Sequence, residues 1–176
     1  MDVAQQLDGL LETQGLKALL RAGWVRVGVP APEDVAAHSW GVSLLVLALL
    51  PTGLDRGRAL SYAVLHDLPE VRAGDITPSD NVSAQDKAAR EHAAMEALGK
   101  NLPPHLQALW LEYEAQQTAE ARFVRQLDRV DMALQALHLH RQGQAHMAQF
   151  VESAVRFVDD PALVPLLAEI ARRLRG

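Results

Sequence analysis

Cysteine is absent from the 176-residue chain. This absence excludes disulfide bonds, thiolate metal sites and cysteine nucleophiles together. Aromatic residues are also scarce, at 5% of the sequence, whereas hydrophobic residues as a whole reach 49% and are dominated by alanine and leucine. A chain of this length and composition can bury a core without covalent crosslinks, and its alanine and leucine content favours helices.

The sequence also lacks an excess of positive charge and a long apolar run. The net charge is -5, so there is no broad basic field to attract a phosphate backbone, and we do not expect a nucleic-acid polymer as partner. The strongest apolar run, residues 42–50, has about half the length of a bilayer span and ends at Pro51. Because the first residues are acidic and polar, unlike a signal peptide, we expect a cytoplasmic protein.

The spacing of the apolar residues predicts an all-α protein, with one compact helical bundle forming a single domain over residues 1–176. Ser83 is an expected N-cap, Pro32 is expected in the first turn of a helix, and residues 21–30 are predicted to form a loop. In the predicted helix over residues 56–68, the side chains expected to face the core are Leu60, Ala63, Val64 and Asp67. Helices are predicted over residues 3–20, 32–50, 56–68, 83–98, 119–141, 145–157 and 161–174, with a further helix opening at Pro103 and Pro104.

His66 and Asp67 are adjacent near the end of a predicted helix. The pair alone is weak evidence for a metal site, because adjacent histidine and aspartate occur by chance in many chains. His38 and Asp128 strengthen it, since both lie on or beside apolar helical faces, where an unsatisfied polar group pays a desolvation cost. One divalent cation would satisfy two imidazoles and two carboxylates at once.

Each of these residues also has a purely structural interpretation. His38 alone would most often be a core histidine bonded to a backbone carbonyl. Asp128 could pair with Arg125, three residues earlier on the same helix. The remaining histidines have no carboxylate partner at a persuasive spacing, and the charged cluster over residues 87–91 is predicted to be an exposed surface.

Five short segments follow one another between about residues 16 and 135. They are LRAGW at residues 20–24, PEDVAAHS at 32–39, HDLPE at 66–70, GDIT at 74–77 and QLDR at 126–129. In their order and spacing they resemble the HD-domain hydrolases, and within that family the small proteins similar to 5'-deoxynucleotidases.

The resemblance implies an HD-domain fold with one divalent cation bound in an H…HD…D pattern. The four implied ligands are His38, His66, Asp67 and Asp128. Glu70 and Asp75 match acidic residues beside the metal, and Glu70 could orient the attacking water or accept its proton. A donor set of nitrogen and oxygen without sulfur favours Mn, Co, Fe or Ni over Zn or Mg.

The resemblance also implies which residues bind the substrate. Arg21 and Trp24 match a pair near the substrate phosphate and sugar, and Thr77 is a further candidate. Arg26 is an alternative to Arg21 for the phosphate, and the sequence leaves both open. Asp75 could protonate the departing sugar oxygen or bind a sugar hydroxyl, and these two roles also stay open.

The function expected on this basis is metal-dependent hydrolysis of deoxyribonucleoside 5'-monophosphates, which are small-molecule nucleotides. A homodimer is also expected, and the resemblance alone implies it. One alternative is another HD-type reaction, on nucleoside triphosphates, cyclic nucleotides or an alarmone. A diiron oxygenase would need further histidines between Asp67 and Asp128, where only His92 and His105 are available. A non-catalytic nucleotide-binding protein is the alternative outside the enzymes.

Overall fold

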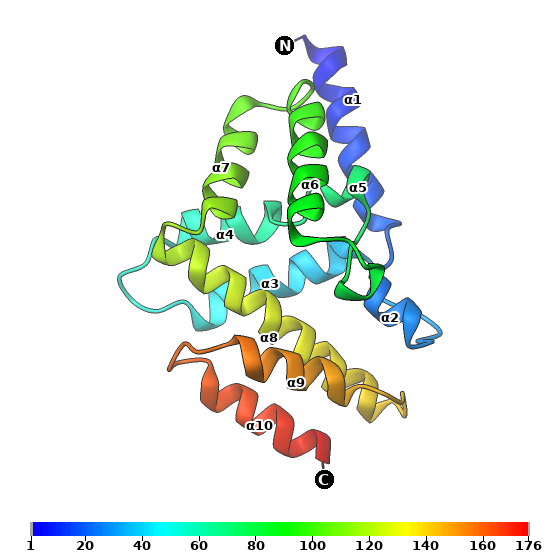
Figure 1. Cartoon of the computed structure of the whole chain (residues 1–176). Coiled ribbons are helices and arrows are strands. Elements are labelled where there is room, and N and C mark those ends of the chain that lie inside the picture. The colour runs from blue at the N-terminus through cyan, green and yellow to red at the C-terminus, as the bar shows by residue number, and fades with distance from the viewer. Residues whose placement is uncertain (1, 176) are drawn as a thin grey trace. The chain divides into compact units, whose positions relative to one another are not determined.

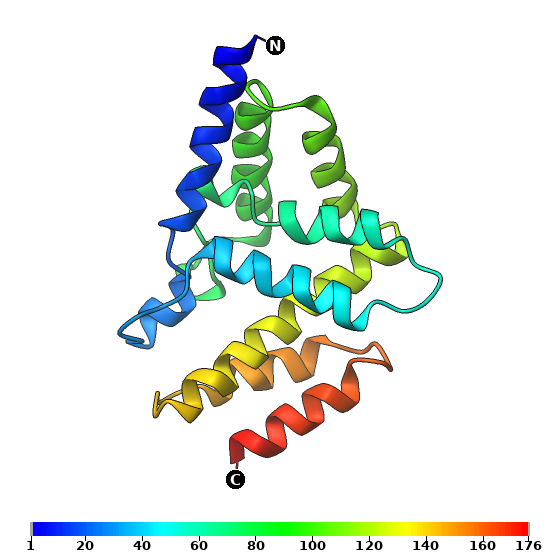
Figure 2. The same cartoon turned by 180° about the vertical axis from the view of Figure 1, so that it is seen from behind.

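The computed structural model describes residues 2–175, and every regular element in that range is an α-helix or a 3-10 helix (Figures 1 and 2). The predicted all-α class is therefore confirmed. An isolated bridge between Leu20 and Asp34 is the one sheet-like pairing within this range. In chain order the elements are α1 (Val3–Thr13), η1 (Gln14–Lys17), α2 (Ala22–Arg26), α3 (Val35–Leu49), α4 (Arg56–Leu65), α5 (Glu70–Ala73), η2 (Pro78–Asp80), α6 (Ala84–Gly99), α7 (Pro104–Ala115), α8 (Ala119–Arg141), α9 (Ala148–Phe157) and α10 (Val164–Arg175).

The helices form two compact units. Of the described residues, the first contains 2–40 and 64–115, and the second contains 41–63 and 116–175. In the first unit, apolar side chains that lie far apart in sequence pack into one buried cluster, and burying each leucine contributes about 1.5–3 kcal/mol. The members of this cluster are Leu16, Val35, Leu65, Leu68, Met95, Leu98, Leu102 and Trp110.

Helix α1 packs closely on the connection between α6 and α7. A Cβ atom added at Gly9 would lie 2.1 Å from the backbone oxygen of Asn101, so the two backbones approach as closely as glycine permits. Both cartoon views accordingly draw α1 alongside α6 (Figures 1 and 2).

The second unit is built around α8 and the two helices that follow it. Thr118 caps α8, because its hydroxyl accepts a hydrogen bond from the Ala121 N–H at 3.1 Å. The Gln126 side chain accepts hydrogen bonds from the backbone N–H groups of Asp159 and Asp160, at 3.1 and 2.9 Å. These bonds tie α8 to the connection between α9 and α10.

Several predicted boundaries differ from the structure. The helix predicted over residues 3–20 ends at Thr13 and continues as η1, residues 22–26 form α2 instead of a loop, and the helix predicted over residues 56–68 ends at Leu65. Helix α3 begins at Val35, three residues later than predicted, because the Asp34 carboxylate accepts a hydrogen bond from the Ala37 N–H at 2.7 Å. Val64 was predicted to face inward but is 57% exposed.

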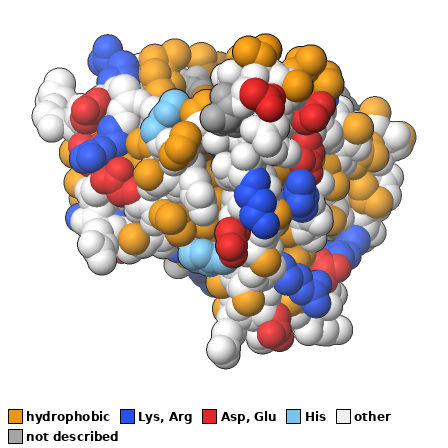
Figure 3. Space-filling model, turned by 90° about the horizontal axis from the view of Figure 1, so that it is seen from above, with side chains coloured by type: hydrophobic (Ala, Val, Ile, Leu, Met, Phe, Trp, Pro, Cys, Tyr) orange, Lys and Arg blue, Asp and Glu red, His pale blue; other side chains and the backbone are white. Residues whose placement is uncertain are grey.

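The surface carries charges of both signs. On the face shown in Figure 3, acidic and basic side chains are interspersed with hydrophobic ones. Among residues 2–175, no helix combines the length and the apolarity needed to cross a bilayer.

Candidate active site

The turn after α4 positions the adjacent His66 and Asp67. Helix α4 ends at Leu65, and Pro69 has no N–H with which to continue its hydrogen-bond ladder. Instead, the Leu68 N–H donates to the Leu65 oxygen at 3.0 Å, and the Glu70 N–H donates to the Asp67 oxygen at 3.0 Å. The proline thus converts the end of the helix into a tight turn from which both side chains project.

His38, in the first turns of α3, meets this pair inside the first unit. Its Nε2 atom lies 3.3 Å from Nε2 of His66. The Asp67 Oδ2 atom lies 3.2 Å from the His66 Nε2 and 3.7 Å from the His38 Nε2. The structure therefore brings together three of the four predicted ligands, as a group whose donor atoms are close enough to share one metal ion.

The environment of these three residues fits a cation. His38 and His66 are 1% and 6% exposed, and their imidazole nitrogens converge with a carboxylate oxygen, a donor set that suits divalent transition metals. Burial acts to raise the pKa of Asp67, but its interactions with His66, and then with His38 and Arg21, lower that pKa well below its usual range. Asp67 is therefore held as the carboxylate that a metal site requires.

Glu70 lies at the start of α5 and is 3% exposed. Burial raises the pKa of Glu70 well above its ordinary value, and the neighbouring carboxylates of Asp67 and Asp75 raise it further. Its Oε2 atom is buried without a hydrogen-bond partner among the described residues. A buried, unsatisfied carboxyl is costly to a fold, and such groups occur where function requires them.

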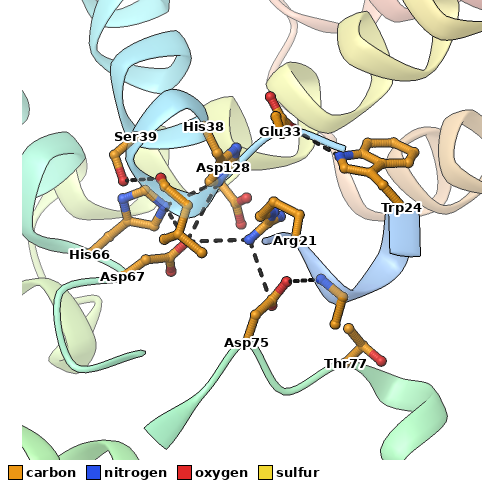
Figure 4. A network of polar contacts seen from close by, with 12 residues as sticks. Arg21, Trp24, Glu33, His38, Ser39, His66, Asp67, Asp75, Thr77 and Asp128 are labelled. Carbon is orange, nitrogen blue, oxygen red and sulfur yellow. Dashed lines mark hydrogen bonds and ion pairs between the residues drawn. The ribbon is translucent and has the colours of Figure 1, made fainter. Parts of the chain in front are cut away.

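Arg21 and Asp75 connect α2 to this cluster (Figure 4). The Arg21 Nη1 atom donates to the Asp67 Oδ2 at 3.4 Å and lies 3.8 Å from the Asp75 Oδ1. The other Asp75 oxygen, Oδ2, accepts a hydrogen bond from the Ala22 N–H at 2.7 Å, at the start of α2. Asp75 thus fixes the backbone at the start of α2 and lies within ion-pair distance of the Arg21 guanidinium.

The other three predicted substrate-binding residues have protein partners. Trp24 is 2% exposed, and its indole nitrogen donates to the Glu33 carboxylate at 2.9 Å (Figure 4). Arg26 donates to both the Thr77 hydroxyl and the Asp80 carboxylate. The hydrogen bond between Arg26 and Thr77 therefore holds α2 against the segment before η2. Of the two candidate arginines, Arg21 is the one directed at His38, His66 and Asp67.

Comparison with known proteins identifies the family. The sequence model of the HD domain matches residues 13–162. The chain belongs to the HD-domain family. It is 37% identical to 5'-deoxynucleotidase HDDC2 of Bos taurus, in a match that covers 88% of this chain and 78% of the relative. With 5'-deoxynucleotidase HDDC2 of Homo sapiens it shares 35% identity, over 88% of this chain and 79% of the relative.

Solved structures agree with this family assignment. A protein from Pyrococcus horikoshii OT3 superimposes with a TM-score of 0.79 and 31% identity, over 95% of this chain and 99% of the other. A predicted metal-dependent phosphohydrolase from Magnetospirillum magnetotacticum gives a TM-score of 0.72 and 28% identity, over 97% of this chain and 93% of the other.

The fourth ligand predicted for this HD-domain protein, Asp128, belongs to the second unit. It lies on α8 with its side chain 19% exposed, and its Oδ2 atom is 3.8 Å from Nε of Arg129. Its role as a ligand stays a prediction from the motif.

Sequence reasoning missed two aromatic residues of this HD-domain protein on α7. The Trp110 indole nitrogen donates to the backbone oxygen of His66 at 3.2 Å. The Tyr113 ring lies edge-on to the His66 imidazole, with centroids 6.0 Å apart. In a chain with so few aromatic residues, a tryptophan and a tyrosine three positions apart on one helix were the available signal.

The predicted i,i+4 surface pair on α6 is present, with the Lys87 side chain 39% exposed, but it also faces the site electrostatically. Lys87 pairs with Glu91 at 3.2 Å, and the Glu91 side chain is only 14% exposed. Burial opposes the positive charge, but Glu91, Glu70 and Asp67 raise the pKa of Lys87 above its ordinary value. Lys87 therefore interacts electrostatically with Glu70 and Asp67 of the candidate site.

Proposed function

We propose that this chain is a metal-dependent phosphomonoesterase that hydrolyses deoxyribonucleoside 5'-monophosphates to the deoxynucleoside and inorganic phosphate. The observation that carries the proposal is the convergence of the buried His38 and His66 with the partly buried Asp67, beside the unsatisfied Oε2 atom of Glu70. The substrate class is supported by the relatives named 5'-deoxynucleotidase, which align with most of this chain.

The proposed ligands of one divalent cation are His38, His66, Asp67 and Asp128. The first three are supported by their geometry, and Asp128 by its place in the sequence pattern alone. We propose Mn, Co, Fe or Ni rather than Zn or Mg, because the donor atoms are imidazole nitrogens and carboxylate oxygens. When bound, such a cation neutralises charge on the phosphate and lowers the pKa of a water molecule.

Glu70 is the proposed general base. It lies one turn beyond the His66–Asp67 pair, and because burial and the neighbouring carboxylates raise its pKa, it is a stronger proton acceptor than an ordinary carboxylate. As the water oxygen bonds to phosphorus, Glu70 accepts the proton that the water loses. The bond from phosphorus to the sugar 5'-oxygen breaks, that oxygen takes a proton from solvent as the deoxynucleoside leaves, and Glu70 returns its own proton to solvent.

Arg21 is the proposed phosphate-binding residue. Its guanidinium is directed toward Asp67 but is only loosely bonded there, at 3.4 Å, so a phosphate oxygen can compete for its N–H groups. Asp75 already accepts one backbone N–H, and a carboxylate in that setting is suited to accept a hydrogen bond from a sugar hydroxyl. We therefore favour sugar binding over acid catalysis for Asp75.

Trp24 is the proposed sugar-facing residue that disfavours a ribose 2'-hydroxyl. The indole is buried and its nitrogen is bonded to Glu33. It would therefore meet the sugar only through a small part of its surface, and it could not move aside to admit a 2'-hydroxyl. Arg26 and Thr77 are proposed to support substrate binding indirectly, by holding α2 against the segment before η2.

Metal analysis of the purified protein, followed by phosphate release from paired deoxy- and ribonucleoside monophosphates, tests this proposal. We expect one divalent cation per chain and faster release from the deoxy substrates. Asp67→Ala should lose both bound metal and activity. Full activity of Asp67→Ala on deoxynucleoside monophosphates would refute the assignment of the metal site. Faster hydrolysis of triphosphates or cyclic nucleotides would instead favour one of the other HD-type reactions.

We propose further that residues 1–176 act as one HD domain and that the protein is a homodimer. The single domain is supported by the family match, which runs through both compact units. Exposed apolar side chains on α1, including Leu7 and Leu11, are the kind of surface that symmetric interfaces bury. Light scattering at the mass of a monomer would contradict the dimer.

A further inference from the structure

Trp110 on α7 contacts the turn that carries the candidate metal ligands, although it has no ligand atom of its own. The residue is 1% exposed, and its indole Nε1–H donates to the backbone oxygen of His66 at 3.2 Å. A tryptophan buried this deeply needs a partner for its N–H, and here that partner is a carbonyl of the His66–Asp67 pair.

The His66 carbonyl is exposed to this bond because the helix is interrupted. In a continued α-helix, the oxygen of His66 would accept the N–H of Glu70. Here the Glu70 N–H donates to the Asp67 oxygen instead, at 3.0 Å. The indole N–H of Trp110 therefore replaces the Glu70 N–H as the donor to the His66 carbonyl. A hydrogen bond from another helix thus fixes this carbonyl.

Neighbouring rings hold both partners of this bond. The His92 ring meets the Trp110 indole edge-on, with centroids 4.9 Å apart and an interplanar angle of 75°. The Tyr113 ring meets the His66 imidazole edge-on at 6.0 Å. Because α7 thus contacts both the backbone and the ring of His66, it restricts the orientation of the imidazole.

We propose that Trp110 is a positioning residue for metal binding: its hydrogen bond to the His66 carbonyl fixes the turn that presents His66 and Asp67 to the cation. The inference rests on the metal site of the proposed function, but not on the identity of the substrate. Outer partners that orient metal ligands typically change metal affinity by about 10–100-fold when they are removed.

Trp110→Phe tests the proposal, because it removes the N–H donor and keeps an aromatic ring in the core. The measurement is the dissociation constant for Mn²⁺, obtained by titrating metal-free protein. We expect this constant to rise by about 10–100-fold. At saturating Mn²⁺, the KM for a deoxynucleoside monophosphate should return close to the wild-type value, because Trp110 is only 1% exposed and in this proposal acts through the metal ligands alone.

Leu102→Ala is the matched control for a general loss of stability. Leu102 belongs to the same buried cluster as Trp110, so its truncation lowers the melting temperature without removing the bond to His66. We expect Leu102→Ala to bind Mn²⁺ with nearly wild-type affinity. Equal losses of affinity in the two variants would assign Trp110 a purely structural role and overturn the proposal.

A second variant addresses the case in which Trp110→Phe does not fold. Replacing the indole at position 110 by benzothiophene substitutes sulfur for the N–H at almost unchanged shape. Weaker Mn²⁺ binding by this variant supports the proposal, and unchanged binding overturns it. If the wild type binds Mn²⁺ but releases phosphate from no deoxynucleotide, the proposed function fails while the assignment of Trp110 stands; absence of Mn²⁺ binding by the wild type removes both.

Discussion

Two carboxyl groups three residues apart, the partly buried Asp67 and the buried Glu70, have pKa values displaced in opposite directions. Asp67 faces two imidazoles and the guanidinium of Arg21, which together outweigh its burial. Glu70 is buried next to other carboxylates and cannot be ionised as easily. Asp67 therefore stays ionised and is suited to bind a cation, whereas Glu70 is suited to accept a proton during catalysis.

Glu70→Gln should abolish most turnover while leaving metal binding intact. Glutamine keeps the shape of the side chain but cannot accept the proton from water, so we expect kcat to fall by about 10²–10⁴-fold. Metal content and kcat are measured on the same preparation. Glu96→Gln, on the exposed face of α6, is the control and should behave as wild type; a Glu70→Gln enzyme with wild-type kcat would exclude Glu70 as the base.

The raised pKa of Glu70 also predicts a pH dependence of stability in the metal-free protein. A group whose pKa is higher in the folded state contributes stability below its unfolded value, here about 4.5, and this contribution is lost as pH rises through the folded pKa. As pH rises from about 4.5 through the higher pKa of the folded state, the free energy of unfolding of the wild type should therefore fall relative to that of Glu70→Gln. Denaturant titrations at several pH values measure the difference, and a constant difference would contradict the shift.

At the scale of helices, the sequence predicted the elements that are stabilised locally. The long helix α8 has the predicted bounds of residues 119–141. Likewise α6 follows the predicted cap Ser83, whose hydroxyl accepts the Asp86 N–H. The five-residue helix α2 escaped prediction because it depends on remote partners: the Asp75 carboxylate, 53 residues away, bonds its first N–H. Such contacts leave no periodic signal in the sequence.

The packing of α1 gives a prediction at this same scale. Gly9→Ala would favour the helix by about 1 kcal/mol on propensity alone. However, the new Cβ atom would lie 2.1 Å from the backbone oxygen of Asn101, which cannot rotate away. We expect displacement of α1 and a net loss of about 1–3 kcal/mol in the free energy of unfolding, measured by urea denaturation.

Gly57→Ala in α4 is the matched control for Gly9→Ala. Its Cβ atom would meet only the Asp55 side chain, at 3.3 Å, which can shift by a few tenths of an ångström. We expect its stability to remain within about 1 kcal/mol of wild type. If Gly9→Ala were as stable as Gly57→Ala, this would contradict the close contact between α1 and the backbone at Asn101.

At the scale of the whole molecule, the site combines residues that the sequence could and could not reveal. His38, His66 and Asp67 were accessible because polar residues on apolar faces need a common partner, and the family pattern gave the same residues. Trp110 was not accessible, because its contribution is a hydrogen bond to a backbone carbonyl and depends on how α7 packs beside the turn after α4. Motifs reveal the groups that do chemistry, whereas the groups that orient them depend on packing.

If one cation joins ligands from distant parts of the chain, metal binding must stabilise the fold as a whole. A ligand at 100 times its dissociation constant adds about 2.7 kcal/mol to the folded state, which for a protein of this size raises Tm by about 5–10 °C. We therefore expect Mn²⁺ to raise the Tm of metal-free protein by this amount and a chelator to reverse the change. Asp67→Ala should show no such shift, since its site lacks the carboxylate that lies within 4 Å of both histidines. A shift of equal size in Asp67→Ala would mean that the stabilising ion binds elsewhere, and the convergence of His38, His66 and Asp67 would then need an explanation other than metal binding.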